Sequence, residues 1–390
     1  MSDNVMARER PDVGSYDDIV AAAVRTTGLD DFGGTDFGGN SHEEGLRVLT
    51  EDLSSPEAGL TPRGNYFQRS EVKSALVGVL LTQAQFAAHP EHTDVPIERP
   101  IFVMGLPRTG TTALHRLLHA DPAAQGLEMW LTQYPQPRPP RETWESDPIF
   151  TAMQQAFSAH HVESPEYMGI HYMDATTVEE CWRLLRQTGK SNSYESLANV
   201  PRYTEWLQGQ DWTDAYARHK QNLQLVGLND RDKRWVLKNP SHMTALDALM
   251  TVYPDALIVY THREPVTCIA SSCSLSAETT VGHSTTYVGE VIGRTQLDLW
   301  SRSFHAFHDA RPAYDQAQFA DVAFADLLKD PLGTVADIYE QFEIEWTPDA
   351  RAAVEEIDRE SKQGQAKPSH RYALEDYGLT EAQVHAAFDR

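Results

Sequence analysis

Basic residues are scarce in this chain of 390 residues. Lys and Arg number 33 against 57 Asp and Glu, which gives a formal net charge of −24. Proteins that bind nucleic acid need basic surface to neutralise phosphates, so this balance argues against nucleic acid as a partner. An anionic ligand would depend on a few basic side chains gathered at its site, because the rest of the protein has a negative electrostatic field.

Cysteines and long apolar runs are scarce as well. Cys181, Cys268 and Cys273 lack the spacing of metal ligands, and we expect them to be free thiols in a reducing compartment, the cytoplasm. The N-terminal MSDNVMARERPDVG has no apolar signal core. No run approaches the roughly 18 apolar residues of a membrane span, so we expect neither secretion nor a transmembrane segment.

Apolar periodicity divides the chain into a helical beginning and an α/β remainder. Residues 1–95 are expected to form a helical segment packed on the core, because YDDIVAAAVRTT and HEEGLRVLTEDL show apolar spacing of three and four. Residues 96–390 are expected to form the α/β domain. Within it, residues 130–230 are rich in Trp and Tyr but poor in strand pattern, which predicts a mainly helical segment inserted into, or laid over, the α/β core.

Strands and helices alternate in the rest of that domain. IFVMG, RWVLK and ALIVYTH are predicted strands, and FADVAFADL is a further candidate. SHMTALDALMTVY, with Ser241 as its cap, and VTCIASSCSL, preceded by Pro265, are predicted helices. Such alternation predicts a three-layer, P-loop-like α/β fold with a central parallel sheet.

The stretch GLPRTGTT follows the first predicted strand and has the spacing of a phosphate-binding loop. Loops that bind nucleoside triphosphates carry lysine where this chain has Thr111. Arg108, inside the loop, can supply the missing cation. Backbone N–H groups of the loop and of the helix that starts at Thr111 suit a phosphate or sulfate group.

Two more basic residues stand at predicted strand ends, where parallel sheets bind their ligands. Lys238 closes RWVLK, and Arg263 follows ALIVYTH. In an acidic chain, the coincidence of these two residues with Arg108 predicts an anion site at the sheet edge. His160, His161 and His171 lack nearby carboxylates at the spacing of a zinc site, so no metal site is predicted.

Two motifs resemble those of the sulfotransferase family. PIFVMGLPRTGTTALHRLL is similar to its 5′-phosphosulfate loop, and YTHREPVTCIASS to its 3′-phosphate motif. In the second motif an arginine is followed by a proline two residues later and a serine eight residues later, here Arg263, Pro265 and Ser271. WVLKNPSHMTALDALMTVYPDA and KPSHRYALEDYGL resemble the bacterial, largely actinobacterial, branch. The resemblance covers about residues 95 to 385.

The resemblance implies a P-loop-like sulfotransferase that uses 3′-phosphoadenosine 5′-phosphosulfate (PAPS) and leaves 3′,5′-adenosine bisphosphate (PAP). It would transfer a sulfuryl group in line, without a metal ion, and its acceptor would be the hydroxyl of a small, partly apolar phenol, lipid or other metabolite. The implied contacts to the 5′-phosphosulfate are Arg108, Thr109, Gly110, Thr111 and Thr112. The implied contacts to the 3′-phosphate and adenine are Arg263, Ser271 and Phe324, with Lys362, Gly364 and Arg371 as C-terminal candidates.

The catalytic base is open at this stage. By resemblance it is Glu128, slightly preferred for its place after the first helix of the domain, or His242, which follows Lys238 by four residues. Lys238 is the expected electrophilic helper. Arg108 stands where many members have lysine, and whether it assists the leaving oxygen is a further question. Trp130, Tyr134 and Tyr172 are the candidates for the acceptor pocket.

Two other functions fit part of the pattern. A P-loop kinase or nucleotidase would use ATP and Mg²⁺, but it requires a lysine at position 111 and a Walker-B-like strand that ends in Asp. A non-catalytic protein would bind the nucleotide and transfer nothing. The sequence does not decide the identity of the acceptor or the oligomeric state.

Overall fold

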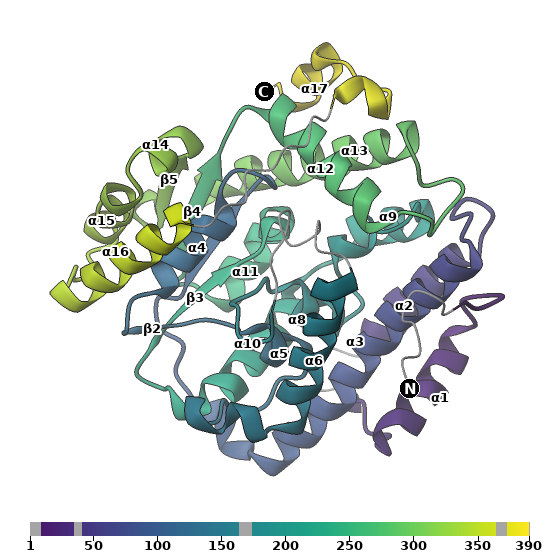
Figure 1. Cartoon of the computed structure of the whole chain (residues 1–390), viewed down its shortest axis with the longest axis horizontal. Helices are drawn as coiled ribbons and strands as arrows, with labels where there is room; N and C mark the ends of the chain where they lie inside the picture. The colour runs from purple at the N-terminus through teal and green to yellow at the C-terminus, as the bar shows by residue number, and fades with distance from the viewer. Residues whose placement is uncertain (1–8, 35–40, 164–173, 364–372, 390) are drawn as a thin grey trace.

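A five-stranded parallel sheet forms the centre of the protein, in a computed structural model that describes residues 9–34, 41–163, 174–363 and 373–389. The strand order is β2-β3-β1-β4-β5, and every neighbouring pair is parallel (Figure 1). This arrangement confirms the predicted α/β fold. The strands are β1 Ile101–Gly105, β2 Ala124–Gln125, β3 Arg234–Lys238, β4 Leu257–His262 and β5 Phe319–Ala323.

Alternate residues of the central strand enter two separate cores, because side chains of a strand point to opposite faces. Ile101 and Val103 enter the smaller core, whereas Phe102 and Met104 enter the larger one. Figure 1 shows the smaller core's helices on one side of the sheet and the main helical body on the other. The helices of the smaller core are α4 Thr111–His119, α14 Phe324–Lys329, α15 Pro331–Gln341 and α16 Pro348–Gln363.

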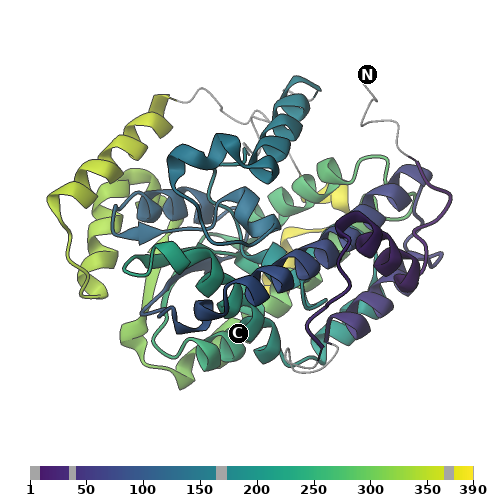
Figure 2. The ribbon, with the colours of Figure 1, turned by 90° about the horizontal axis from the view of Figure 1, so that it is seen from below.

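The main helical body contains the N-terminal helices, the helices between β2 and β3, those that follow β3 and β4, and the C-terminal helix. As predicted, the described residues of 130–230 hold helices and loops without a strand. Figure 2 shows the long α3 crossing this body. The domain boundaries stay a prediction. The helices are α1 Tyr16–Thr27, α2 Ser41–Leu53, α3 Pro62–Ala88, α5 Met129–Gln133, α6 Pro148–Glu163, α8 Trp182–Arg186, α9 Pro201–Gln208, α10 Thr213–Val226, α11 Leu246–Val252, α12 Pro265–Thr279, α13 Glu290–Ala310 and α17 Glu381–Phe388.

Short 3₁₀ helices connect many of these elements. They are η3 Pro90–Asp94, η4 Arg141–Ser146, η5 Asn192–Tyr194, η6 Gly227–Asn229, η7 Pro240–Ala245, η8 Arg311–Ala313, η9 Gln316–Gln318 and η10 Leu374–Tyr377. Of these, η5 and η7 carry side chains that matter for the candidate site.

One local prediction was wrong, one was right only in part, and one strand was missed. Ser241 does not cap a helix; the side chain of Asn239 accepts from Ser241 N, and the segment starts as η7 before α11. The candidate strand FADVAFADL ends at Ala323, and Phe324 begins α14. The edge strand β2 was not predicted, because two residues are too short to show an alternating pattern.

Two histidines lie in the larger core with aromatic neighbours. His219 Nδ1 lies 2.8 Å from Tyr253 Oη, and His242 Nδ1 lies 2.8 Å from Tyr216 Oη. Both histidines are completely buried. Burial lowers the pKa of His219 to about 3 and holds the pKa of His242 well below its usual value, with the neighbouring His219 adding to the second effect. Both rings are therefore neutral in the fold at neutral pH.

We expect these histidines to make the protein sensitive to acid. The pKa of each ring is lower in the fold than in the unfolded chain. The stability that the two neutral rings contribute is therefore fully present above pH 6.5, and it is lost as the pH falls towards their pKa values in the fold. At pH 5 the burial of His219 should lower the free energy of unfolding by about 2 kcal/mol. In urea unfolding at pH 7 and pH 5, His219→Asn should reduce the pH dependence by about that amount. An unchanged pH dependence in the variant would contradict this account.

Candidate active site

Two glycines shape the loop between β1 and α4. Gly105 has φ 149°, and a Cβ there would lie 2.2 Å from the carbonyl oxygen of Thr261 on β4. Gly110 has φ 87°, and a Cβ there would lie 3.0 Å from the ring of Phe324. A Cβ at position 105 would collide with the backbone of β4, and the φ of position 110 is one that residues with a Cβ rarely adopt, so both positions favour glycine.

Arg108 sits inside this loop with φ 72°, in the left-handed region that costs a non-glycine residue on the order of 1 kcal/mol. Its Nε donates to Ser271 Oγ on α12 at 3.1 Å. Its carbonyl oxygen accepts a hydrogen bond from Arg263 Nη1 at 3.2 Å. The structure thus brings Arg108 together with Arg263 and Ser271, which follow it by 155 and 163 residues in the chain.

Arg263 and Phe324 form the next layer of this cluster. The Arg263 guanidinium lies over the Phe324 ring, 4.3 Å from its centroid. Because the sheet is parallel, the carboxyl ends of β4 and β5 place these two residues at the same edge as the loop.

The threonines of the loop have different surroundings. Thr109 Oγ1 donates to the Leu106 carbonyl at 2.7 Å and lies 2.5 Å from Thr261 Oγ1. Thr109 is completely buried, so its side chain fixes the loop to β4. Thr111 starts α4 and is also buried, whereas Thr112 is half-buried and contacts Lys238.

Lys238 joins the loop to a carboxylate that the sequence analysis did not select. Its Nζ donates to Thr112 Oγ1 at 3.2 Å and to Glu180 Oε1 at 2.5 Å. The Lys238 side chain is only 2% exposed. Glu180 is held against β3 because the next residue, Cys181, donates its N–H to the Lys238 carbonyl at 3.1 Å. The Lys238 ammonium group thus lies between the Glu180 carboxylate and the loop that joins β1 to α4, which we call the anion loop.

A cavity of about 400 Å³ begins beside this pair. Its lining includes Pro107 of the loop and Glu180, and it extends between α3, α8, α12 and α13. Most of its surface is apolar, and a few charged groups interrupt it, as in many small-molecule sites. The apolar side chains include Phe67, Met129, Trp182, Leu197, Leu275 and Trp300, and the charged ones are Glu71, Glu179, Glu180, Arg183 and Arg186.

Neither predicted base lines this cavity. Glu128 is buried and pairs with Arg138 Nε at 3.2 Å, and burial raises the pKa of its carboxyl against the lowering effect of Arg138. It is Met129, the next residue, that lines the cavity. His242 lies in the aromatic core with Tyr216. A base must reach the hydroxyl it deprotonates, so the role of base stays a prediction for both residues.

The predicted acceptor residues do not line the cavity either, as far as the structure describes them. Trp130 is completely buried and packs edge-on against Trp144, 5.4 Å between ring centroids. Tyr134 is half-buried at the end of α5, and burial raises its pKa. Tyr172 lies outside the described residues.

The C-terminal candidates have no demonstrated contact with the loop. Lys362 is exposed and pairs with Asp358 at 2.6 Å along α16. Gly364 and Arg371 lie outside the described residues, so their role stays a prediction.

Glu180, Arg186 and Asn192 are cavity residues that sequence reasoning missed. All three belong to the segment 130–230, which has no strand pattern to mark a ligand-binding end. Glu180 meets Lys238 only because β3 packs beside its segment, and no spacing within the sequence encodes that contact.

Within the described residues, no three side chains of His, Cys, Asp or Glu gather as they would around a metal ion. Across the same part of the chain, no helix has the length and apolar character needed to cross a bilayer. The three cysteines are buried and free.

The chain is similar to several known proteins. A family model described as the sulfotransferase family matches residues 100–348. The crystal structure of sulfotransferase STF1 from Mycobacterium tuberculosis H37Rv is 53% identical, covers 97% of this chain and 99% of its own, and superposes with a TM-score of 0.90. Sulfotransferase STF9 from Mycobacterium avium is 27% identical, with coverages of 99% and 96% and a TM-score of 0.84.

Among curated proteins, the omega-hydroxy-beta-dihydromenaquinone-9 sulfotransferases Stf3 of Mycobacterium bovis and Mycobacterium tuberculosis are each 24% identical over 257 residues. The match spans 62% of this chain and 62% of the length of those relatives.

Proposed function

Because the chain belongs to the sulfotransferase family, we propose that it transfers the sulfuryl group of PAPS to a hydroxyl of a small, partly apolar acceptor. The observation that carries this proposal is the position of Lys238. Its Nζ contacts Thr112 of the anion loop and Glu180 of the cavity. The loop that would hold the donor and the cavity that would hold the acceptor thus both adjoin the Lys238 ammonium group. A positive charge at this point would stabilise the negative charge of the sulfuryl group during transfer.

The residues at the sheet edge fit a donor with two separate anionic groups. The loop offers backbone N–H groups and the N-terminus of α4 to the 5′-phosphosulfate, together with Thr111 and Thr112. Arg263 and Ser271 would hold the 3′-phosphate, and Phe324 would lie beside the adenine. When bound, PAPS supplies an activated sulfuryl group whose bond to the 5′-phosphate oxygen breaks on transfer.

Arg108 is better suited to the 3′-phosphate side than to the reacting end. Its guanidinium contacts Ser271, whereas Lys238 stands beside the cavity. We therefore propose that Lys238 stabilises charge at the transferring group and that Arg108 binds the donor.

On the acceptor side, Glu180 would accept the proton of the attacking hydroxyl. Its carboxylate lines the cavity and lies 2.5 Å from Lys238 Nζ. The ammonium has three N–H groups, so it can orient the carboxylate and contact an anion at the same time. The proton moves from the acceptor oxygen to a Glu180 oxygen and then to solvent, while the apolar walls limit competing water.

The acceptor class rests on the cavity and on one relative. The curated relatives are named for a hydroxylated dihydromenaquinone, a largely apolar molecule with a hydroxyl. A cavity of about 400 Å³ with Phe67, Leu197 and Trp300 in its walls suits the hydroxyl-bearing end of such a molecule or a small phenol. We propose the cytoplasm as the location, in line with the free cysteines.

Thermal unfolding with nucleotides tests the donor. PAP should raise the melting temperature clearly, because it carries the 3′-phosphate that Arg263 and Ser271 would bind. ATP with Mg²⁺ should raise it far less, since the loop has Thr111 where a triphosphate loop has lysine. Equal stabilisation by both ligands favours a kinase or nucleotidase, and stabilisation by neither removes PAPS as donor. If PAP binds but no sulfuryl group passes from labelled PAPS to any hydroxyl acceptor, the result supports a non-catalytic nucleotide-binding protein.

A further inference from the structure

The cavity of about 400 Å³, which we call the acceptor cavity, adjoins a second cavity of about 580 Å³. Asn192 belongs to the lining of both. The linings also follow one another along α13, where Gln296 and Trp300 line the acceptor cavity and Arg302 and Ala306 line the second. The two cavities therefore lie one after the other along this helix.

The same order holds along η7 and the residues beside it. Residues 239–241 line the acceptor cavity, and residues 244–248 line the second. The boundary between the cavities therefore lies where η5, η7 and α13 come together: at Asn192 of η5, within η7, and between Trp300 and Arg302 of α13. The side chains at this boundary decide whether a ligand in the acceptor cavity can extend further.

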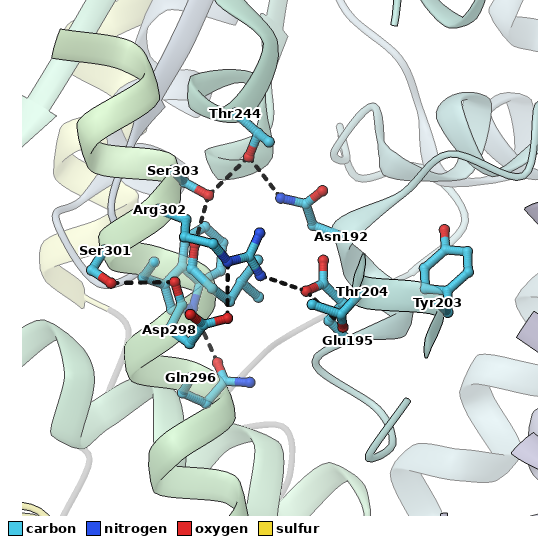
Figure 3. A network of polar contacts seen from close by, with 12 residues as sticks. Asn192, Glu195, Tyr203, Thr204, Thr244, Gln296, Asp298, Ser301, Arg302 and Ser303 are labelled. Atoms are coloured by element: carbon cyan, nitrogen blue, oxygen red, sulfur yellow. Dashed lines mark hydrogen bonds and ion pairs between the residues drawn. The ribbon is translucent and has the colours of Figure 1, made fainter. Parts of the chain in front are cut away.

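Three polar contacts connect η5, η7 and α13 at this boundary, and Figure 3 shows them together. Asn192 Nδ2 donates to Thr244 Oγ1 at 2.7 Å, which joins η5 to η7. Thr244 Oγ1 lies 2.8 Å from Ser303 Oγ, which joins η7 to α13. Arg302 Nη2 donates to Glu195 Oε2 at 2.7 Å, which joins α13 to the residue that follows η5. We call these five residues the end wall.

The end wall is held in one arrangement. Asn192 is 1% exposed, and Ser303 and Glu195 are buried as well. Ser303 Oγ donates to the Leu299 carbonyl at 2.8 Å, so it accepts from Thr244. Thr244 has then used its own proton and accepts from Asn192 Nδ2, which fixes the amide of Asn192. Because protein interiors are close-packed, a ligand could pass this point only by displacing a side chain.

We propose that the end wall sets the longest acceptor that the site can enclose, and that Asn192 is the residue that determines this length. Glu180 and Asn192 both line the acceptor cavity. With the reacting hydroxyl at Glu180, an apolar tail that runs along the cavity meets the wall at Asn192. The inference rests on the proposed function for the position of that hydroxyl.

The space behind the wall suits the continuation of an apolar tail. Leu207, Trp212 and Leu246 give the second cavity apolar surface beside its polar and charged groups. A shorter side chain at position 192 would join the two cavities, so that further CH₂ groups of the tail could leave water. Burial of one CH₂ group tightens binding about fourfold.

Four phenols test the inference by calorimetry on the complex of the enzyme with PAP: 4-ethylphenol, 4-butylphenol, 4-hexylphenol and 4-octylphenol. In the wild-type protein, binding should tighten with tail length until the tail meets the wall, and 4-octylphenol should bind no tighter than 4-hexylphenol. In Asn192→Ala the tightening should continue. The affinity for 4-octylphenol relative to 4-ethylphenol should then be at least about tenfold higher than in the wild-type protein, as two further buried CH₂ groups imply.

Two further substitutions at position 192 separate the effect of space from that of hydrogen bonding. Asn192→Ser is short but keeps a hydroxyl that can donate to Thr244, so it should behave like Asn192→Ala and serves if that variant does not fold. Asn192→Leu has a similar shape to asparagine and fills the wall, so it should keep the wild-type length limit. Ser196→Ala is the matched control and should also keep it, because Ser196 lines the acceptor cavity but not the second.

The inference is overturned if the variants with a short side chain at position 192 keep the wild-type limit, or if binding to the wild-type protein still tightens from 4-hexylphenol to 4-octylphenol. An equal shift of the limit in Asn192→Leu or Ser196→Ala, or binding of none of the four phenols, would also overturn it. Initial rates with labelled PAPS are measured in parallel. A limit that shifts as expected while no phenol is sulfated counts against the proposed function alone.

Discussion

Replacing Glu180 by glutamine is expected to lower kcat by about 100-fold to 10,000-fold, the range that a positioned general base contributes. Glutamine has the shape of the carboxylate and can still accept from Lys238 Nζ, but it cannot take a proton from the acceptor hydroxyl. The dissociation constant of PAP should change less than about threefold, because Glu180 faces the cavity and not the loop. Steady-state kinetics and calorimetry measure the two effects separately.

Glu128→Gln provides the matched control for that substitution. Glu128 is also a buried carboxylate with a basic partner, Arg138, but it does not line the cavity. Its replacement should lower the melting temperature, because Arg138 loses a buried charge partner, and should leave kcat of the folded protein within about threefold. A large loss of kcat in Glu128→Gln, with little loss in Glu180→Gln, would restore Glu128 as the base.

Replacing Arg263 by alanine is expected to weaken PAP about 100-fold and 5′-AMP less than about threefold. A charge-assisted pair with phosphate contributes more than a neutral hydrogen bond, and only PAP has the 3′-phosphate. The substitution also removes the guanidinium from Phe324 and from the Arg108 carbonyl. A general disturbance of the loop would therefore weaken both nucleotides, and calorimetry with the two ligands distinguishes the cases.

Arg311→Ala is the control at the opposite end of β5. The Arg311 guanidinium stacks on Phe319, 4.8 Å from its centroid, much as Arg263 stacks on Phe324. Arg311 pairs with Asp321 and takes no part in the loop. Its loss should leave PAP binding within about threefold. Equal losses of PAP affinity in the two variants would indicate a general effect of net charge and remove Arg263 from the 3′-phosphate.

The order of strands and helices, and the cluster of Arg108, Arg263 and Ser271, could be predicted from the sequence. Each belongs to a local motif in which spacing encodes geometry: a strand, a glycine loop and a helix start. Lys238 was predicted for the same reason, because it ends a strand with a clear apolar pattern. Parallel pairing of β3, β1 and β4 then places these strand ends together.

The acceptor side could not be predicted, because long-range contacts form it. Glu180 reaches Lys238 from a segment without strand pattern, and Trp130 was chosen for its aromatic ring although that ring is core. A single sequence cannot distinguish an apolar residue that packs in the core, as Trp130 does, from a neighbour that lines a cavity, as Met129 does. Nor does a sequence reveal which of several carboxylates a lysine will meet.

The strand order also has a consequence for the way the protein reaches its native state. The central strand β1 pairs with β3 and β4, whose partner residues lie about 135 and about 156 positions later in the chain. Closing segments of that length is entropically costly, and folding slows as contacts become less local. During synthesis the anion loop thus emerges long before the two strands that shape it. We expect it to gain its final conformation late, and truncated chains that end before β4 to lack it.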